Sequence, residues 1–299
     1  MNQTKHELDN LTVFLISTDE ETYEKSKKSL LNQNSIFKIK EIKNIFPMSA
    51  AFQYMPDNCE TDYFIQLDAD MILHHNSIYK LYTEILNSSF LTYRISGKLY
   101  EEGFGIGGHI KCWKKSIFKN FSFKNSRTVD RNFHNRVKWF GFRNKLLNEI
   151  LGNHVPRHSV LSEFLKTKSD IEKWKYLRRD ADKYGIPLLI KVVNENSIPK
   201  FFGLLMSCLS PWNRIIISKD INYEKKIFDF IEPYISKGSL NNFNLSQLNL
   251  DHIKMIFFKL YSNKINNYQY KNDLIGFIEI ITNCKIDKFN FLIKFDGIK

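Results

Sequence analysis

Residues 63–70 read YFIQLDAD, a β-rich apolar run that ends in two aspartates, Asp68 and Asp70. A run of this length and composition predicts a buried strand at 63–67. Residues i and i+2 of an extended chain point to the same side, and ligands of open α/β sheets bind outside the carboxyl ends of the strands. Two carboxylates there can bind a hard divalent cation, Mn²⁺ or Mg²⁺. An ordinary surface turn is the other interpretation, and the preceding strand favours the metal site.

The segments around this strand alternate between β and helical patterns. Residues 11–17 (LTVFLIS) form an apolar run, residues 37–45 alternate apolar and polar side chains, and residues 77–86 have helical spacing. We also expect a helix at 21–33 that is capped by residues 18–21, a helix start at 47–54 and a strand at 90–95. This alternation predicts an α/β fold with a mostly parallel sheet flanked by helices.

The pattern is less regular beyond residue 100. We predict a flexible turn at 103–108 (GFGIGG), a short helix at 112–118, a loop at 151–158 and a charged helix at 163–184. After residue 187 the spacing is mainly helical. These patterns divide the chain into a Rossmann-like catalytic domain at residues 1–200 and a mainly helical C-terminal region of unknown role at 201–299.

The composition is that of a globular protein, with 299 residues, 43% hydrophobic and 25% charged side chains. It excludes wholesale disorder. Apolar stretches such as 201–209 are too short to span a bilayer, and the polar residues 1–10 show no secretory signal. The four cysteines are too widely spaced for a CxxC pair, and they would stay free in a reducing compartment. We therefore expect a cytoplasmic protein.

Positive charge is concentrated in the middle third of the chain. Residues 1–100 carry a net charge of −3, residues 101–200 carry +11 and the remainder carries +4. Between Lys111 and Lys145 there are eleven basic residues and one acid, Asp130. Such a field attracts phosphates, anionic lipid headgroups, nucleic acid or acidic glycans. A solvated basic face without a partner is the other interpretation.

Four segments of the N-terminal third resemble glycosyltransferases of the GT-A fold, most closely those of glycosyltransferase family 2. Residues 11–18 (LTVFLIST) resemble the opening strand, and 28–33 (KSLLNQ) resemble the end of the first helix. Residues 46–55 (FPMSAAFQYM) resemble the start of the next helix, and 62–73 (DYFIQLDADMIL) resemble the strand that carries the metal-binding aspartates. The resemblance implies a nucleotide-sugar donor, a divalent metal ion and transfer of a sugar.

The resemblance also implies which residues bind the donor and the metal ion. Asp70 would be the main metal ligand, and Asp68 would face the ribose or the metal. For Thr18, a helix cap is an equally good interpretation. The implied nucleotide-sugar contacts are Ser17, Thr18, Asp19, Asn44, Ser49 and Asp68.

The acceptor side is expected in the middle third. Residues 105–118 (GIGGHIKCWKKSIF) resemble the glycine-containing stretch that precedes an aromatic residue of the acceptor pocket. Trp113 would stack on a sugar, although a core tryptophan is the commoner case. His109 would contact phosphate or would satisfy a turn.

An inverting transferase needs a carboxylate that deprotonates the acceptor hydroxyl. Asp130, in TVDRNFH, is the candidate, and the surrounding basic residues would hold it ionised. The family has a Glu-Asp pair at this point, whereas this chain has Val129 before the aspartate. The competing bases are Glu101 and Glu102, and the competing role is an ion pair with Arg127 or Arg131.

Residues 151–158 (LGNHVPRH) resemble the late histidine-containing loop that completes the metal site of several GT-A enzymes. Imidazole can bind Mn²⁺ beside two carboxylates, and we favour His154 over His158 for this role. Arg157 would grip the diphosphate of the donor.

Three functions remain open from the sequence. The first is metal-dependent glycosyl transfer in the synthesis of a bacterial surface glycan, with an anionic or lipid-linked acceptor and possible peripheral contact at the inner face of the membrane. The second is nucleotidyl transfer on a similar sheet, but STDEETYEK at 17–25 lacks the usual glycine-rich loop. The third is a non-catalytic module that binds anions. Nucleic acid is not an expected partner, because no RNA-binding signature occurs.

Overall fold

The computed structural model describes residues 5–18, 20–101, 105–155, 159–210, 221–262 and 268–298. The chain divides into two compact units, residues 1–157 and residues 158–299. Strands β1 to β7 belong to the first unit, and helices α5 to α12 belong to the second.

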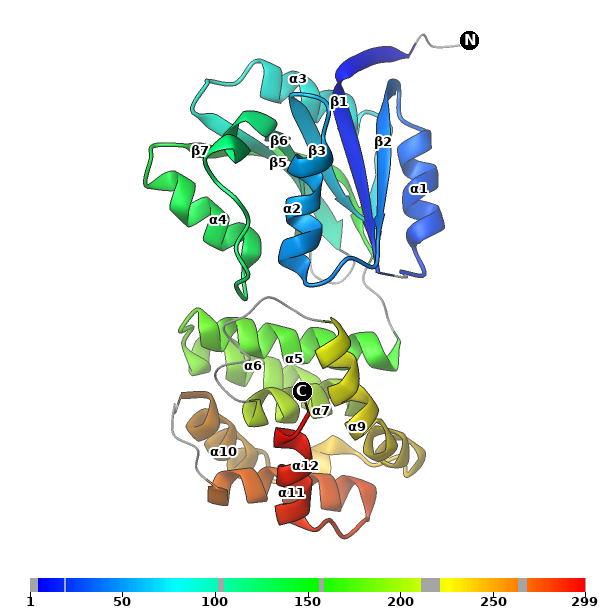
Figure 1. The fold of residues 1–299 in the computed structure, drawn as a ribbon. Coiled ribbons are helices and arrows are strands. Elements are labelled where there is room, and N and C mark those ends of the chain that lie inside the picture. The colour runs from blue at the N-terminus through cyan, green and yellow to red at the C-terminus, as the bar shows by residue number, and fades with distance from the viewer. Residues whose placement is uncertain are drawn as a thin grey trace. The chain divides into compact units, whose positions relative to one another are not determined.

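The first unit is built on a seven-stranded sheet in the order β2-β1-β3-β6-β5-β7-β4 (Figure 1). β1 is parallel to β2 and β3, and β5 is parallel to β7. β6 is antiparallel to β3 and β5, and β4 is antiparallel to β7. The predicted α/β class is confirmed. The prediction of a mostly parallel sheet is wrong, because three of the six strand pairings among the described residues are antiparallel. The strands are β1 (His6–Ser17), β2 (Ser35–Lys43), β3 (Tyr63–Asp68), β4 (Met71–Leu73), β5 (Thr92–Glu101), β6 (Gly105–Lys114) and β7 (Arg143–His154).

Two of these strands differ from the sequence prediction. β6 covers residues that we expected in a flexible turn and a helix, and β7 extends through the first part of the expected loop at 151–158. β6 pairs with β3 on one side and β5 on the other, and the core clusters on the two faces of the sheet bury Ile110, Cys112 and Trp113 completely. The backbone pairing and packing of β6 thus outweigh the low strand propensity of its glycines.

Helices cover both faces of the sheet (Figure 1). Leu30 of α1 and the Ile78, Leu81 and Ile85 stripe of α3 join one core cluster. The other face is covered by α2 and α4, which share a second, aromatic-rich cluster. The four helices are α1 (Tyr23–Leu31), α2 (Met48–Asn58), α3 (Ser77–Leu86) and α4 (Val129–Lys138), and a short 3₁₀ helix, η1 (Lys115–Lys119), follows β6.

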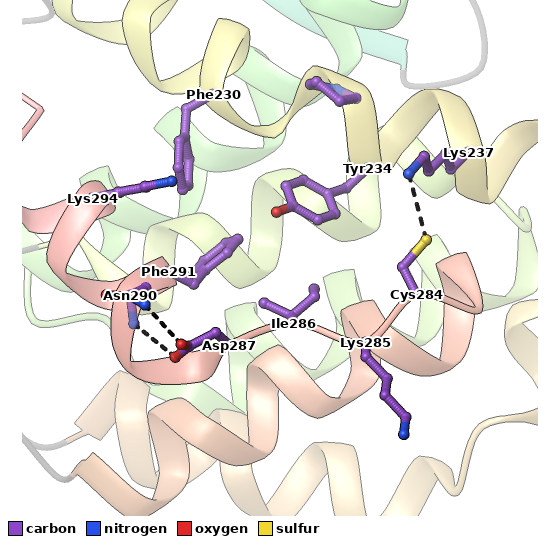
Figure 2. Close-up of a pocket in the computed structure, with 11 residues that line it drawn as sticks. Phe230, Tyr234, Lys237, Cys284, Lys285, Ile286, Asp287, Asn290, Phe291 and Lys294 are labelled. Carbon is purple, nitrogen blue, oxygen red and sulfur yellow. Dashed lines mark hydrogen bonds between the residues drawn. The ribbon is translucent and has the colours of Figure 1, made fainter.

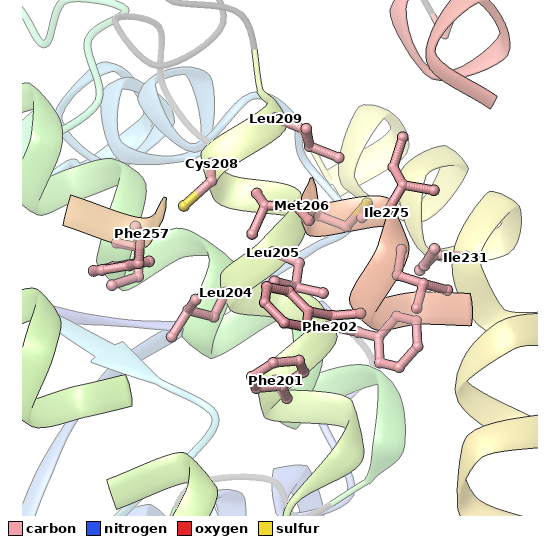
Figure 3. Close-up of a cluster of buried hydrophobic side chains, with 14 of the residues drawn as sticks. Phe201, Phe202, Leu204, Leu205, Met206, Cys208, Leu209, Ile231, Phe257 and Ile275 are labelled. Carbon is pink, nitrogen blue, oxygen red and sulfur yellow. The ribbon is translucent and has the colours of Figure 1, made fainter. Parts of the chain in front are cut away.

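The second unit is a helical bundle around α7, whose side chains fill its core (Figure 3). Phe201, Phe202 and Leu205 are fully buried, so the apolar stretch at 201–209 is core. None of the described helices is long and apolar enough to span a membrane. The helices are α5 (Val160–Tyr176), α6 (Ile186–Asn194), α7 (Ile198–Leu209), α9 (Ile221–Leu240), α10 (Leu250–Ser262), α11 (Tyr268–Thr282) and α12 (Lys288–Asp296), with the short turns η2 (Ala181–Gly185) and η3 (Leu245–Gln247).

The division between the units lies at residues 157 and 158, whereas the sequence patterns placed it at residue 200. Buried ion pairs explain the difference. Lys168 of α5 is fully buried, and its amine lies 2.7 Å from Glu172 and 2.8 Å from Glu224 of α9. Lys175 donates to the Ser207 carbonyl of α7 at 3.2 Å. The charged helix that the sequence predicted at 163–184 therefore belongs to the second unit and not to a domain that ends at residue 200.

Candidate active site

The turn that carries the two aspartates is fixed to its neighbours through the backbone. Asp68 is the last residue of β3 and lies opposite Ile16 of β1. The Ala69 amide donates to the Ile16 carbonyl at 2.9 Å, and the Thr22 hydroxyl donates to the Ala69 carbonyl at 2.8 Å. Asp68 and Asp70 are thus held at the carboxyl end of a buried strand, where the sequence predicted them.

The structure brings His154 to Asp70, although the two residues are 84 positions apart in the chain. Met71 of β4 pairs with His154 of β7, and the Val155 amide donates to the Asp70 carbonyl at 2.7 Å. His154 Nε2 lies 3.2 Å from Asp70 Oδ2, and its Nδ1 lies 2.7 Å from Glu101 Oε2. Glu101 was a candidate base in the sequence analysis. Here its carboxylate holds the far side of the imidazole, a role that the sequence did not predict.

The carboxylates of this cluster change the pKa of their neighbours. The hydrogen bond to Asp70 raises the pKa of His154 to about 9, with a further contribution from Glu101 and against the effect of burial. At neutral pH the imidazole is therefore a cation. Burial, followed by the negative charge of Asp70, raises the pKa of Asp68 to about 6. Because the negative charges of Asp68 and Asp70 repel each other, a cation that binds between them would stabilise both ionised carboxylates.

The two aspartates fit a divalent metal ion. Asp70 Oδ1 is buried and has no hydrogen-bond partner among the described residues, which is costly unless a cation or water satisfies it. No group of three or more His, Cys, Asp or Glu is arranged as a metal cluster within the described residues. Mg²⁺ sites of this kind use one or two carboxylates and take the remaining ligands from substrate phosphates and water. His154 would have to lose its proton before it could bind a metal ion.

Gly152 of β7 pairs with Leu73 of β4 and has no room for a side chain. A Cβ at this position would lie 2.4 Å from the Ile72 carbonyl oxygen and 3.0 Å from Leu73 Cα. Both atoms belong to the backbone, so a side chain would have to push the two strands apart. The strand that ends at His154 is therefore held against the strand that begins after Asp70.

We expect Gly152→Ala to lower the free energy of unfolding by about 1–3 kcal/mol, the usual cost of overpacking. It should also increase the distance between Asp70 and His154, because the two residues flank this strand contact. Chemical denaturation followed by circular dichroism measures the first effect. Gly276→Ala is the matched control, since its Cβ would meet only the flexible Lys288 amine at 3.7 Å. Equal stability of Gly152→Ala and the wild type would contradict the close strand contact.

The predicted donor-binding residues gather at the ends of β1 and β2. The Glu20 carboxylate accepts hydrogen bonds from the Ser17 hydroxyl at 2.8 Å, the Thr18 amide at 2.6 Å and the Thr18 hydroxyl at 2.6 Å. The Asn44 amide donates to the Ser17 carbonyl at 3.0 Å. Ser49 is buried in the first turn of α2. The sequence analysis did not single out Glu20 as a partner of this group.

The helix-cap interpretation of Thr18 is wrong, because α1 begins only at Tyr23 and Thr18 bonds to Glu20 instead. Three of the predicted site residues lie outside the described residues. They are Asp19, Arg157 and the alternative histidine, His158. Glu102, a competing base, is also outside them.

Asp130 lies in the first turn of α4 and forms an ion pair with Lys111 of β6, at 2.6 Å. Lys111 is paired with Gln66, whose amide donates to Asp68 Oδ1 at 3.3 Å. The Lys111 charge holds the pKa of the Asp130 carboxyl well below its usual range. Asp130 is thus an anion close to the strand end that carries Asp68. The ion pair forms with Lys111, not with Arg127 or Arg131 as the competing role required.

The two predicted acceptor residues differ in exposure. Trp113 is fully buried and lies among Phe64, Phe118 and Phe133, so no face of its ring is open to an acceptor. The core interpretation of this tryptophan is the one that the structure supports. His109 lies on β6 and is exposed to solvent over part of its ring. The part that is covered by protein, together with the charge of Lys111, lowers its pKa. It is therefore neutral at physiological pH.

A separate cavity of about 430 Å³ lies in the helical unit (Figure 2). Lys237 and Lys294 line it together with the rings of Tyr234 and Phe291. Its one lining carboxylate, Asp287, already accepts the Asn290 amide and side-chain nitrogen at 3.1 and 2.7 Å. This cavity has no free acid–base pair, so the candidate active site remains the strand end in the first unit.

No protein-family model matches the sequence, and no curated protein matches it. Three solved structures illustrate the similarities in fold. Mannosyltransferase PcManGT from Pyrobaculum calidifontis, in complex with GDP-Man and Mn²⁺, is 8% identical with a TM-score of 0.43 over 54% of this chain and 62% of its own. S. aureus TarS 1–349 is 10% identical with a TM-score of 0.41 over 84% of this chain and 90% of its own. Glycosyltransferase GlyE from Streptococcus pneumoniae TIGR4 is 14% identical with a TM-score of 0.31 over 46% of this chain and 45% of its own. Similarity at this level does not assign an activity, so the assignment rests on the site itself.

Proposed function

We propose that this protein is a metal-dependent glycosyltransferase that moves a sugar from a nucleotide-sugar donor to an acceptor hydroxyl. The observation that carries the proposal is the buried Asp70 Oδ1, which has no partner in the described part of the chain and follows Asp68 at the carboxyl end of β3. A carboxylate oxygen left without a partner in such a place is costly unless it serves a ligand. The four sequence segments that resemble GT-A enzymes all lie in this unit.

Each residue has a defined task in this proposal. Asp68 and Asp70 would hold Mn²⁺ or Mg²⁺, which neutralises the charge that develops on the leaving diphosphate. Glu101 and His154 orient the Asp70 carboxylate through hydrogen bonds. Ser17 and its neighbours at the end of β1 would contact the nucleoside, and Asp130 would accept the proton of the acceptor hydroxyl.

The acceptor that we propose is an anionic or lipid-linked glycan of a bacterial surface. The support is the charge of +11 in residues 101–200 against −3 in residues 1–100. If the basic residues bound only the donor phosphates, we would expect an excess of positive charge in residues 1–100 as well, where the proposed nucleotide contacts lie. Nucleotidyl transfer is the alternative reaction for this site, and it would also use Asp68 and Asp70 as metal ligands.

A screen of nucleotide sugars tests the proposed activity. One nucleotide sugar should raise the melting temperature in the presence of Mn²⁺ and should be slowly hydrolysed, and EDTA should remove both effects. A set of nucleoside triphosphates with sugar phosphates is run in parallel. Release of pyrophosphate from this second set, without cleavage of any nucleotide sugar, would favour nucleotidyl transfer and contradict the proposal.

His154→Ala should lower the Mn²⁺-dependent activity by about 10- to 100-fold, the usual effect of losing a group that orients a metal ligand. The reason is that Asp70 Oδ2 loses the imidazole that lies 3.2 Å away. Activity is measured as a function of Mn²⁺ concentration. Unchanged activity in this variant, together with loss of activity in His158→Ala, would mean that His158 is the histidine of the site.

A further inference from the structure

The three most exposed aromatic side chains among the described residues belong to the first unit. Trp139 is 90% exposed, Phe90 is 79% exposed and Phe140 is 69% exposed. Phe90 lies in the turn before β5, and Trp139 and Phe140 lie in the turn between α4 and β7. Large aromatic rings left in water forgo about 1.5–3 kcal/mol each of burial free energy. Three in one unit therefore call for a partner that covers them.

These aromatic residues lie at the same edge of the sheet. Thr92 of β5 pairs with Arg143 of β7, and the Arg143 amide donates to the Leu91 carbonyl at 2.8 Å. The two turns therefore adjoin. We call Phe90, Trp139 and Phe140 the aromatic edge. It lies where β5 and β7 begin, whereas Glu101 and His154 lie where these strands end, so it is at the opposite side of the sheet from the candidate active site.

Cations without ion-pair partners surround the aromatic edge. Lys119, Lys138 and Arg143 are exposed, and none has an ion pair within the described part of the chain. Lys119 is the last residue of η1, and Phe121, two residues later, packs its ring against Phe140 with 5.2 Å between centroids. The basic residues are thus adjacent to the exposed rings.

Other members of the basic stretch are already used inside the fold. Lys111 pairs with Asp130, Lys145 pairs with Glu84 at 2.6 Å, and Lys114 donates to the Ser89 carbonyl at 2.9 Å. Lys119, Lys138 and Arg143 are therefore exposed cations that stand beside the aromatic edge without a carboxylate partner among the described residues.

We propose that the aromatic edge binds the headgroup region of an anionic lipid bilayer. Tryptophan and phenylalanine side chains enter the boundary between headgroups and acyl chains, and each nearby Lys or Arg adds attraction to an anionic surface. Charge complementarity favours a lipid surface over a second copy of this chain, because two copies would bring like charges together. The inference goes beyond the proposed function and does not rest on it, because vesicle binding needs no sugar transfer.

The test uses the full chain with vesicles of phosphatidylcholine, with and without phosphatidylglycerol. The protein should sediment with the phosphatidylglycerol vesicles at low salt and much less with the neutral ones, and binding should fall steeply as salt rises. The double variant Trp139→Ser, Phe140→Ser should bind at least about tenfold more weakly, because two exposed rings no longer enter the lipid. Phe289→Ser is the matched control, since this ring is 60% exposed on α12 of the second unit.

Several outcomes would overturn the inference. These are absence of binding to phosphatidylglycerol vesicles at low salt, equal binding by the double variant and the wild type, or a wild-type dimer that the double variant dissociates. The double variant should retain wild-type transfer to a soluble acceptor, because its changes lie at the opposite side of the sheet from Asp70. A protein that binds vesicles but cleaves no nucleotide sugar would overturn the proposed function alone, and an active transferase that ignores vesicles would overturn this inference alone.

Discussion

Asp70→Ala should abolish metal-dependent sugar transfer and leave the fold intact. The side chain ends in one oxygen that contacts His154 and one that is buried without a partner, so removing it takes away a ligand and no core contact. Loss of a metal ligand removes several kcal/mol of transition-state stabilisation. We expect turnover to fall by more than about a thousandfold, which corresponds to about 4 kcal/mol. Turnover with Mn²⁺ and the melting temperature are measured on the same preparation.

Glu149→Gln is the control for a lost carboxylate. Glu149 lies on β7, the strand that ends at His154, and its exposed side chain pairs with Lys80. It should leave turnover and stability unchanged, since exposed ion pairs contribute about 0–1 kcal/mol. A fully active Asp70→Ala enzyme at the wild-type Mn²⁺ concentration would contradict the metal site. A large fall in melting temperature would instead make Asp70 a structural partner of His154.

The part of the fold that local pattern determines could be predicted. The run at 63–67 became β3, with Asp68 as its last residue and Asp70 in the turn that follows. The helical spacing at 77–86 became α3 with the same bounds. β3 is a continuous apolar run that is buried on both faces, and α3 places its apolar side chains on one face, so in both cases short-range preference and burial agree.

The remaining parts depend on contacts between distant residues, which no local pattern reveals. Residues 105–114 contain three glycines and form a strand only because β3 and β5 pair with them on both sides. The contact between His154 and Glu101 joins residues 53 positions apart and follows from the pairing of β5 with β7. Lys168 is fully buried in the helical unit beside two glutamates, and one of them, Glu224, is 56 positions away in the chain.

Asp130→Asn should reduce turnover by about a hundredfold or more, the usual contribution of a general base, while donor binding persists. The asparagine keeps the size of the side chain and loses its capacity to accept a proton. The Lys111 ion pair holds the pKa of the Asp130 carboxyl low, so this base is ionised at every physiological pH. Turnover is measured with saturating donor, and donor affinity is measured separately by calorimetry.

Lys111→Met and the double variant Lys111→Met, Asp130→Asn separate the base from the ion pair. If the carboxylate only neutralises Lys111, then Asp130→Asn leaves an uncompensated, largely buried amine at a cost of about 1–3 kcal/mol. The double variant would then recover both stability and turnover, because neither charge remains. If Asp130 accepts the acceptor proton, the double variant should recover stability and remain as inactive as Asp130→Asn. Recovery of turnover in the double variant would therefore show that Asp130 is not the catalytic base.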